Sequence, residues 1–265
     1  MPYMNDSFRI IGFIPARAES SRFPGKPLAD ICGKPMIVRV MERVKSCSLL
    51  SDVYVATDSK PIYDAVTEHF GKAIMTYENH ASGSDRIAEA ARIAKLGFRD
   101  IIVNVQGDQP LIEPEMIDEV VNPLIEDESV PMSTLIYKIV RDEEIDHPNA
   151  VKTVFDVDNF AIYFSRATIP FCRNSAEKQT YYKHHGIYAY RNDFLQRFNS
   201  LPVGNLEKSE RLEQLRALEY GFRIKVVITG KDSIEVDTPE DLERVRRQYE
   251  KWIEGNLQPK TRTTS

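Results

Sequence analysis

The chain has 265 residues, of which 42% are hydrophobic and 28% charged, a composition typical of one large α/β domain. Its formal net charge of −5 argues against a nucleic-acid-binding role, because such proteins gain affinity when basic side chains displace counterions. We find neither an apolar stretch long enough for membrane insertion nor a signal-peptide pattern at the start. Cys32, Cys47 and Cys172 are spaced as reduced thiols rather than as disulfides or metal ligands, so we expect a cytoplasmic protein.

Strands and helices alternate in the first half of the chain. Apolar, β-branched runs predict buried strands over 8–14, 52–57 and 100–106. Helices are predicted from Pro35 onward, over about 60–69, over 83–95 and over the stretch that carries Met116, Ile117, Val120, Val121 and Leu124. This βαβα order predicts a Rossmann-like, mostly parallel sheet with helices on both faces.

The middle of the chain, about 131–190, has a different character. The runs MSTLIYKI, VKTVF, FAIYFS and GIYAY predict strands with little helix between them, in a mixed sheet or an antiparallel flap. Further elements are predicted as helices over 191–200 and 206–220, a strand over 225–229 and a helix that begins at Thr238-Pro239. We therefore expect one domain over 8–253, with a strand-rich extension suited to dimerisation and a flexible tail over 254–265.

The loop after the first predicted strand carries a local cluster of positive charge. Ligands of open α/β sheets bind beyond the carboxyl ends of the strands, where this loop lies. Arg17, Arg22 and Lys26 lie around Gly25, and their charges suit a triphosphate. The loop is neither a Walker A motif nor a dinucleotide-binding fingerprint, because both glycine spacings are absent. A basic surface loop without a ligand is the alternative interpretation.

Two aspartates follow other predicted strands. Asp108 lies in QGDQP, directly after a buried strand, and Asp237 lies in VDTPED, beside a helix start. Each has a structural alternative, a turn residue for Asp108 and a helix cap for Asp237. Two carboxylates facing a basic loop nevertheless suit Mg²⁺, which takes one or two carboxylates together with substrate phosphates.

Other polar residues allow two interpretations each. His184 and His185 can form a metal site or a strand pair with one ring on each face, and no third ligand at helical spacing favours zinc. Arg166 can bind a substrate carboxylate or an internal acid. Glu213 and Gln214, on a helix with a leucine stripe, can be functional or plain surface residues.

Several sequence blocks together resemble one family, the CMP-Kdo synthetases or 3-deoxy-manno-octulosonate cytidylyltransferases. The resemblance runs from about Ile11 to Arg247 and rests on the blocks IPARAESSRFPGKPL, ATD, SGSDR, NVQGDQP, NAVK, YFSRATIP, KHHGIYAYR, LEQLRALEYG and VDTPEDLERV. The first block is shared with sialic-acid cytidylyltransferases, whereas YFSRATIP, HHGIYAYR and LEQLRALE are more specific to the Kdo enzymes.

The resemblance implies a homodimeric enzyme that transfers CMP from CTP to Kdo, an acidic eight-carbon sugar, with Mg²⁺ as cofactor, for lipopolysaccharide synthesis. The roles it implies are phosphate contacts in catalysis for Arg17, Arg22 and Lys26; cytosine contacts for Ser82, Gly83 and Arg86; a nucleotide or sugar contact for Gln106; Mg²⁺ ligation by Asp108 and Asp237; and a sugar pocket of Arg166, His184, Tyr190, Glu213 and Gln214.

Some positions depart from the family pattern, and alternatives remain. Ala18-Glu19, Ser84-Asp85 and Gln109 replace residues that are more frequent in the family, which bears on substrate detail rather than on the reaction. The nearest alternative substrate is the 8-amino analogue of Kdo, which differs in one polar group. A non-catalytic sugar-nucleotide sensor is a remote alternative, because it predicts loss of the metal aspartates or of Lys26, and all three are present. A glycosyltransferase is disfavoured because QGDQP lacks a D-x-D motif.

Overall fold

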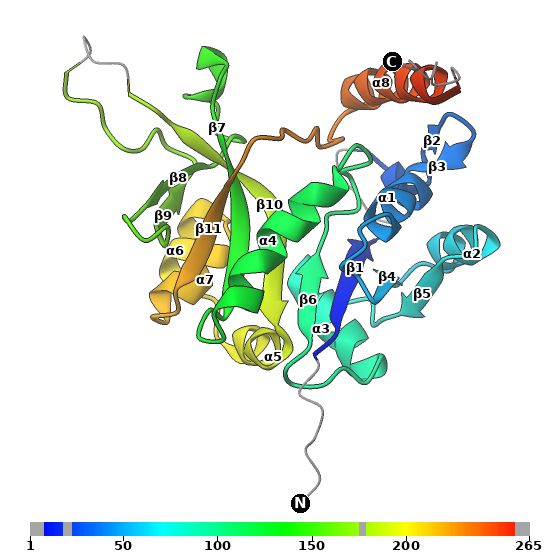
Figure 1. The fold of residues 1–265 in the computed structure, drawn as a ribbon, viewed down its shortest axis with the longest axis horizontal. Coiled ribbons are helices and arrows are strands. Elements are labelled where there is room, and N and C mark those ends of the chain that lie inside the picture. Colours follow the sequence, from blue (N-terminus) through cyan, green and yellow to red (C-terminus); the bar gives the residue numbers. More distant parts are fainter. Residues whose placement is uncertain (1–7, 18–22, 175–178, 258–265) are drawn as a thin grey trace, which may run out of the picture.

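The computed structural model describes residues 8–17, 23–174 and 179–257 (Figure 1). Within them one sheet contains nine strands, β1 (Ile10–Ala16), β4 (Asp52–Thr57), β5 (Lys72–Met75), β6 (Ile101–Asn104), β7 (Met132–Lys138), β8 (Lys152–Phe155), β9 (Ala161–Ser165), β10 (Tyr182–Arg191) and β11 (Ile224–Thr229). Along its main path the order is β11-β7-β10-β6-β1-β4-β5. Strand β1 pairs in parallel with both β4 and β6, so their carboxyl ends lie together at one edge.

Helices cover both faces of the sheet, which confirms the predicted α/β class (Figure 1). On one face α1 (Met36–Lys45), α2 (Lys60–Glu68) and α4 (Pro114–Glu126) pack on β1, β4 and β6. On the other face α3 (Gly83–Ile93), α5 (Asn192–Ser200) and α7 (Gln214–Glu219) form a second apolar core. The central strands are apolar throughout because both of their faces are buried.

The strand-rich middle of the chain joins the main sheet rather than forming a separate flap. Strand β10 pairs antiparallel with β6 and β7, and β11 pairs in parallel with β7. Strands β8 and β9 form an antiparallel pair that is attached to β10 through Lys183 and Lys152. The prediction of a mixed sheet is confirmed, and the alternative of a free antiparallel flap is wrong.

Three local features differ from the predicted elements. The short strand β5 and the hairpin of β2 (Asp30–Ile31) and β3 (Lys34–Pro35) were not expected. The helix predicted over 206–220 is two helices, α6 (Asn205–Glu210) and α7, because Arg211 between them has a left-handed backbone with φ of 52°. Two short 3₁₀ turns, η1 (Lys26–Leu28) and η2 (Asp142–Glu144), lie in loops.

The last helix, α8 (Pro239–Leu257), begins as predicted. The Thr238 hydroxyl accepts the Asp241 N–H at 3.2 Å, and Asp241 accepts the Thr238 N–H at 3.0 Å, which completes a capping box. The helix continues past residue 253, into the segment expected to be a tail, and residues 258–265 lie outside the described part. Leu242 and Val245 bury against Val236 in a third small core, which fixes the segment that carries Asp237. None of the described helices is both long and apolar enough to span a membrane.

Asp100, the residue before β6, connects this strand to Arg9, the residue before β1. It accepts hydrogen bonds from the Arg9 N–H at 2.9 Å, from Arg9 Nη2 at 2.6 Å and from the Gly97 N–H at 2.8 Å. Burial alone raises the pKa of Asp100, but these hydrogen bonds outweigh burial and lower the pKa below its ordinary value.

We expect Asp100→Asn to lower the free energy of unfolding by about 1–3 kcal/mol, because buried donors lose a charged acceptor. The ionised Asp100 carboxylate contributes fully to the free energy of unfolding above its unfolded-state pKa of about 4. This contribution is lost as pH falls through its lower folded-state pKa. Urea unfolding between pH 3 and 7 measures this, with Asp64→Asn, on the surface of α2, as the control. Equal loss of stability at low pH in wild type and Asp100→Asn would contradict the assignment.

Candidate functional site

The predicted ligand-binding segments meet at one cavity of about 290 Å³ beyond the carboxyl ends of β1 and β6. The cavity is lined by Pro15, Ala16, Arg17, Lys26, Pro27, His80, Ala81, Ser82, Gly83, Arg86, Gln106, Gly107, Asp108 and Asp237. Eight of the predicted site residues are among them, and a ninth, Arg22, lies outside the described residues. The structure thus brings together segments that the sequence analysis placed at the ends of different strands.

Lys26 joins the two predicted metal ligands at one end of the cavity. Its Nζ lies 2.8 Å from Asp108 Oδ2 and 3.4 Å from Asp237 Oδ1. The Val236 N–H donates to the Asp108 carbonyl at 2.9 Å, so the backbone also holds the two aspartates together. A side chain at Gly107 would lie 2.9 Å from the Pro15 carbonyl, so only glycine allows the two strand ends to approach this closely.

The donor set at this end fits a divalent cation that arrives with phosphates. Asp108 and Asp237 are both half-buried, and both reach one ammonium group, so their charges converge on a single region. Among the described residues no group of three or more His, Cys, Asp or Glu is arranged to hold a metal. Two carboxylates without a third protein ligand are the arrangement that suits Mg²⁺ completed by substrate oxygens.

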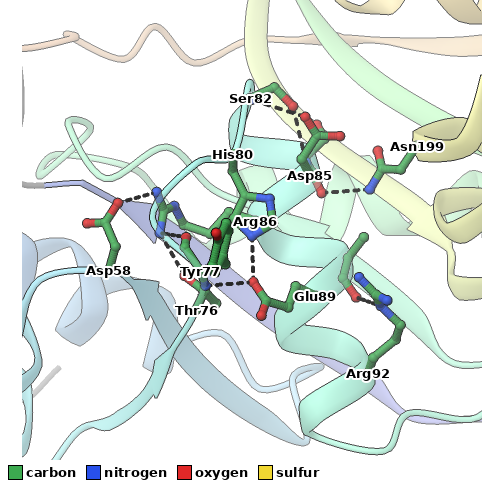
Figure 2. Close-up of polar contacts among 12 residues, drawn as sticks. Asp58, Thr76, Tyr77, His80, Ser82, Asp85, Arg86, Glu89, Arg92 and Asn199 are labelled. Carbon is green, nitrogen blue, oxygen red and sulfur yellow. Dashed lines mark hydrogen bonds and ion pairs between the residues drawn. The ribbon is translucent and has the colours of Figure 1, made fainter. Parts of the chain in front are cut away.

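Arg86 also lines the cavity, and its guanidinium forms hydrogen bonds within the protein (Figure 2). Nη2 donates to Asp58 Oδ2 at 2.5 Å, and Nη1 donates to Thr76 Oγ1 at 2.7 Å and to the Tyr77 carbonyl at 3.3 Å. The residue is 3% exposed. Arg86 therefore fixes the segment that begins at Thr76 against α3.

Ser82 begins α3 and connects it to Glu213. Its hydroxyl accepts the Asp85 N–H at 3.1 Å and donates to Glu213 Oε1 at 2.7 Å, while Ser84 donates to Glu213 Oε2 at 2.9 Å. Burial raises the pKa of Glu213, and the two hydroxyl hydrogen bonds oppose that rise. Gly83 lies at the wall, where an added side chain would approach Pro15 to 3.2 Å.

Gln106 also lines the cavity. Its Nε2 donates to the Gly186 carbonyl at 3.0 Å, at the irregularity where the register of β10 against β7 shifts. This contact joins the end of β6 to the strand that carries His184.

The other residues predicted for the sugar pocket do not line the 290 Å³ cavity. Arg166 donates through Nε to the Glu210 carbonyl at 2.8 Å and through Nη1 to the Pro148 carbonyl at 3.0 Å. Tyr190, 2% exposed, stacks on Tyr188 and Phe198, and burial raises its pKa.

His184 lines a larger cavity on the α8 side, whereas Gln214 lies in packed surroundings. The His184 ring is 2.9 Å from Thr134 Oγ1, and burial together with His185 lowers its pKa to about 3. Gln214 is 5% exposed, and its Nε2 has no hydrogen-bond partner among the described residues. The two histidines face opposite sides of β10, as the strand-pair interpretation predicted, because His184 contacts Phe164 whereas His185 contacts Tyr137.

A larger cavity of about 830 Å³ adjoins the first on the α8 side. Glu235 lines this larger cavity. Desolvation by the surrounding protein and the negative charge of Asp108 raise the pKa of the Glu235 carboxyl, although solvent reaches the residue. Sequence reasoning missed Glu235, His80 and Asp58. The signals available were the position of Glu235 two residues before Asp237, the position of Asp58 as the last residue of the block ATD, and the position of His80 two residues before the block SGSDR.

Comparisons with known proteins agree with this geometry. A family model described as Cytidylyltransferase matches residues 11–227. The 3-deoxy-manno-octulosonate cytidylyltransferase of Syntrophus aciditrophicus (strain SB) is 61% identical over 238 residues, which cover 90% of this chain and 96% of the relative. The 8-amino-3,8-dideoxy-manno-octulosonate cytidylyltransferase of Shewanella amazonensis (strain ATCC BAA-1098 / SB2B) is 53% identical, covering 87% of this chain and 94% of the relative.

A solved structure shares the fold at high similarity. It is described as CMP:2-keto-3-deoxy-manno-octonic acid synthetase complexed with CTP, and it superposes with a TM-score of 0.87 at 42% identity. The match covers 92% of this chain and 99% of that chain. The family model, the relatives and the fold agree, and the chain belongs to the cytidylyltransferase family, in its CMP-Kdo synthetase branch.

Proposed function

We propose that the protein transfers the CMP moiety of CTP to the anomeric hydroxyl of Kdo, releasing pyrophosphate and giving CMP-Kdo for lipopolysaccharide synthesis. The observation that carries the proposal is the convergence of Lys26, Asp108 and Asp237 in one cavity that the start of α3 also lines. The two carboxylates suit a cation that binds together with the phosphates of a nucleotide.

The reaction needs negative charge to be neutralised around the α-phosphorus. The sugar hydroxyl loses its proton to solvent and its oxygen forms a bond to this phosphorus, while the bond to the β-phosphate oxygen breaks, so pyrophosphate leaves with the electron pair. Lys26 and Arg17 line the cavity and supply positive charge to the phosphates. Arg22, in the same loop, is proposed for the same role.

Asp108 and Asp237 are the residues that would hold Mg²⁺ in this site. When bound, the metal supplies charge neutralisation on the phosphates and acidifies a hydroxyl group next to it. This makes a dedicated side-chain base unnecessary. Lys26 then changes partners, from the two carboxylates to phosphate oxygens.

Kdo is favoured over its 8-amino analogue as the sugar. The relative named for Kdo is 61% identical to the chain, whereas the relative named for the amino sugar is 53% identical. Glu213 and Gln106 lie beside the nucleotide cavity, and with Arg166, His184, Tyr190 and Gln214 they are the residues proposed to contact the sugar. We place the reaction in the cytoplasm, in keeping with three cysteines that form no disulfide.

We also propose a homodimer formed through the strand-rich segment. Val140, Ile162 and Phe171 in this segment are 66%, 62% and 86% exposed, and large apolar side chains exposed in one segment favour an interface. Sedimentation equilibrium tests this, and we expect a dimer in the wild type that Ile162→Lys with Phe171→Lys shifts toward monomer. A wild-type monomer at micromolar concentration would contradict the proposal.

The proposed activity is tested by pyrophosphate release from CTP and Mg²⁺ with Kdo and its 8-amino analogue offered separately. We expect release with Kdo and much less with the analogue. The reverse preference moves the substrate to the amino sugar, and no release with either sugar contradicts the proposed reaction.

Asp108→Asn should lower turnover by about 100-fold or more while part of the CTP affinity survives, because one charged metal ligand is lost. Steady-state kinetics together with calorimetric CTP binding measure the two effects separately. A near-normal turnover would remove Asp108 from the proposed metal site.

Lys26→Met should bind Mn²⁺ in the absence of CTP at least about tenfold more tightly than the wild type, because Lys26 no longer neutralises the two aspartates. Electron paramagnetic resonance titration measures free Mn²⁺ directly. Lys34→Met, which loses a surface pair with Glu42, is the matched control. Unchanged Mn²⁺ affinity in Lys26→Met would show that the two aspartates do not form the cation site.

A further inference from the structure

We propose that Glu210 is a positioning residue for the second substrate, because it holds the Arg166 guanidinium where that group can bind the carboxylate of the acidic sugar. This inference deepens the proposed function and rests on it, since Arg166 is one of the residues proposed there to contact the sugar. Both octulosonates carry a carboxylate, so the inference does not depend on which of the two is the substrate.

Glu210, the last residue of α6, makes three hydrogen bonds to Ser165 and Arg166 at the end of β9. Its Oε1 accepts the Ser165 hydroxyl at 2.6 Å, and its Oε2 accepts the Arg166 N–H at 3.0 Å. Its backbone carbonyl accepts Arg166 Nε at 2.8 Å. Hydrogen bonds to an ionised acceptor are stronger than neutral ones, and Ser165 is buried. Glu210 therefore fixes both the backbone and the side chain of Arg166.

The Arg166 guanidinium is also held from a second side. Its Nη1 donates to the Pro148 carbonyl at 3.0 Å. The loop that carries Pro148 is itself fixed, because the fully buried Lys152 donates through Nζ to the His147 carbonyl at 2.8 Å. Two carbonyls on separate segments thus set the orientation of the planar guanidinium group.

The contacts of Arg166 leave its charge available to a ligand. Arg216, on the neighbouring helix α7, donates from two nitrogens to the Glu207 carboxylate, each at 2.6 Å. The half-buried Arg166 guanidinium instead donates to neutral carbonyls, and within the described part of the chain it forms no ion pair and its Nη2 has no partner. A rigidly held guanidinium without a paired acid suits an anionic ligand, and a carboxylate matches its N–H geometry.

The turn between α6 and α7 connects this contact to the nucleotide cavity. Glu213 comes three residues after Glu210 and accepts the hydroxyl of Ser82, which lines the 290 Å³ cavity. Arg211, with φ of 52°, ends α6, so the Glu210 carbonyl has no partner within the helix and can accept Arg166 Nε. One short turn therefore links the proposed sugar contact to a wall of the nucleotide cavity.

Glu210→Gln should raise the KM for Kdo about tenfold or more while changing kcat and the KM for CTP less than about twofold. The reason is that an amide group cannot replace both carboxylate oxygens as acceptors, so Arg166 loses its fixed position. Arg166→Gln should raise the KM for Kdo at least as much. The double variant should lose little beyond Arg166→Gln, because a residue that acts only through another gives non-additive effects.

Pyrophosphate release at varied Kdo and CTP concentrations measures these constants, and thermal unfolding shows that each variant is folded. Glu219→Gln is the matched control, because Glu219 accepts the N–H groups of Asn205 and Glu207 in the same pair of helices without a contact to Arg166. The control should lower stability and leave the KM for Kdo near that of the wild type.

An unchanged KM for Kdo in Glu210→Gln, or effects of Glu210→Gln and Arg166→Gln that add, would overturn the inference. If the wild type releases no pyrophosphate, the proposed function fails, and calorimetric binding of Kdo in the presence of CTP and Mg²⁺ to the same variants decides the role of Glu210. Absence of Kdo binding to the wild type would then overturn the inference as well. If Glu210→Gln does not fold, Glu210→Asp, which keeps the charge and shortens the side chain, decides the same question by the same KM for Kdo.

Discussion

The ion contacts of Lys26 with Asp108 and Asp237 are the interaction on which the site depends. The three residues are far apart in the sequence, and the parallel strands β1 and β6 bring the first two to one edge of the sheet. The small core under α8 then holds the segment of Asp237 against them. Two carboxylates held this close repel one another, so the ammonium group compensates a charge that the fold itself concentrates.

This arrangement explains why a cation and a nucleotide are expected to bind together. Lys26 already neutralises part of the carboxylate charge, so a free divalent cation gains less there than a cation that brings phosphates with it. The phosphates are negatively charged, like the two carboxylates, so Lys26 exchanges one anionic partner for another. Binding of the nucleotide is thereby linked to assembly of the charged site, without a metal held permanently by the protein.

The start of α3 is surrounded by paired groups. Arg86 donates to Asp58 and Thr76, and Glu89 accepts the Tyr77 N–H and contacts His80. The position of the segment around Tyr77 is therefore fixed by buried or half-buried hydrogen bonds on two sides.

The sequence predicted the cavity better than it predicted the partners of each side chain. The ends of β1 and β6 and the segment of Asp237 could be placed together because ligands of open α/β sheets bind at the carboxyl ends of strands. The hydrogen-bonded ion pair between Arg86 and Asp58 could not be predicted, because loop geometry brings together two residues that lie 28 positions apart. The interruption of the helix at Arg211 could not be predicted from the sequence, because leucines before and after it continue the helical spacing of apolar residues. For Tyr190 and Gln214, sequence alone does not reveal that packing leaves each side chain almost wholly buried.

The central claim is that Lys26, Asp108 and Asp237 together form the site for the phosphates of the nucleotide and a cation. A crystal structure of the protein with CTP and Mg²⁺ tests it most directly. We predict that Lys26 leaves the two aspartates for phosphate oxygens and that Asp108 and Asp237 bind the metal. A structure in which Lys26 keeps both aspartates, or in which the metal lies away from them, would contradict the claim.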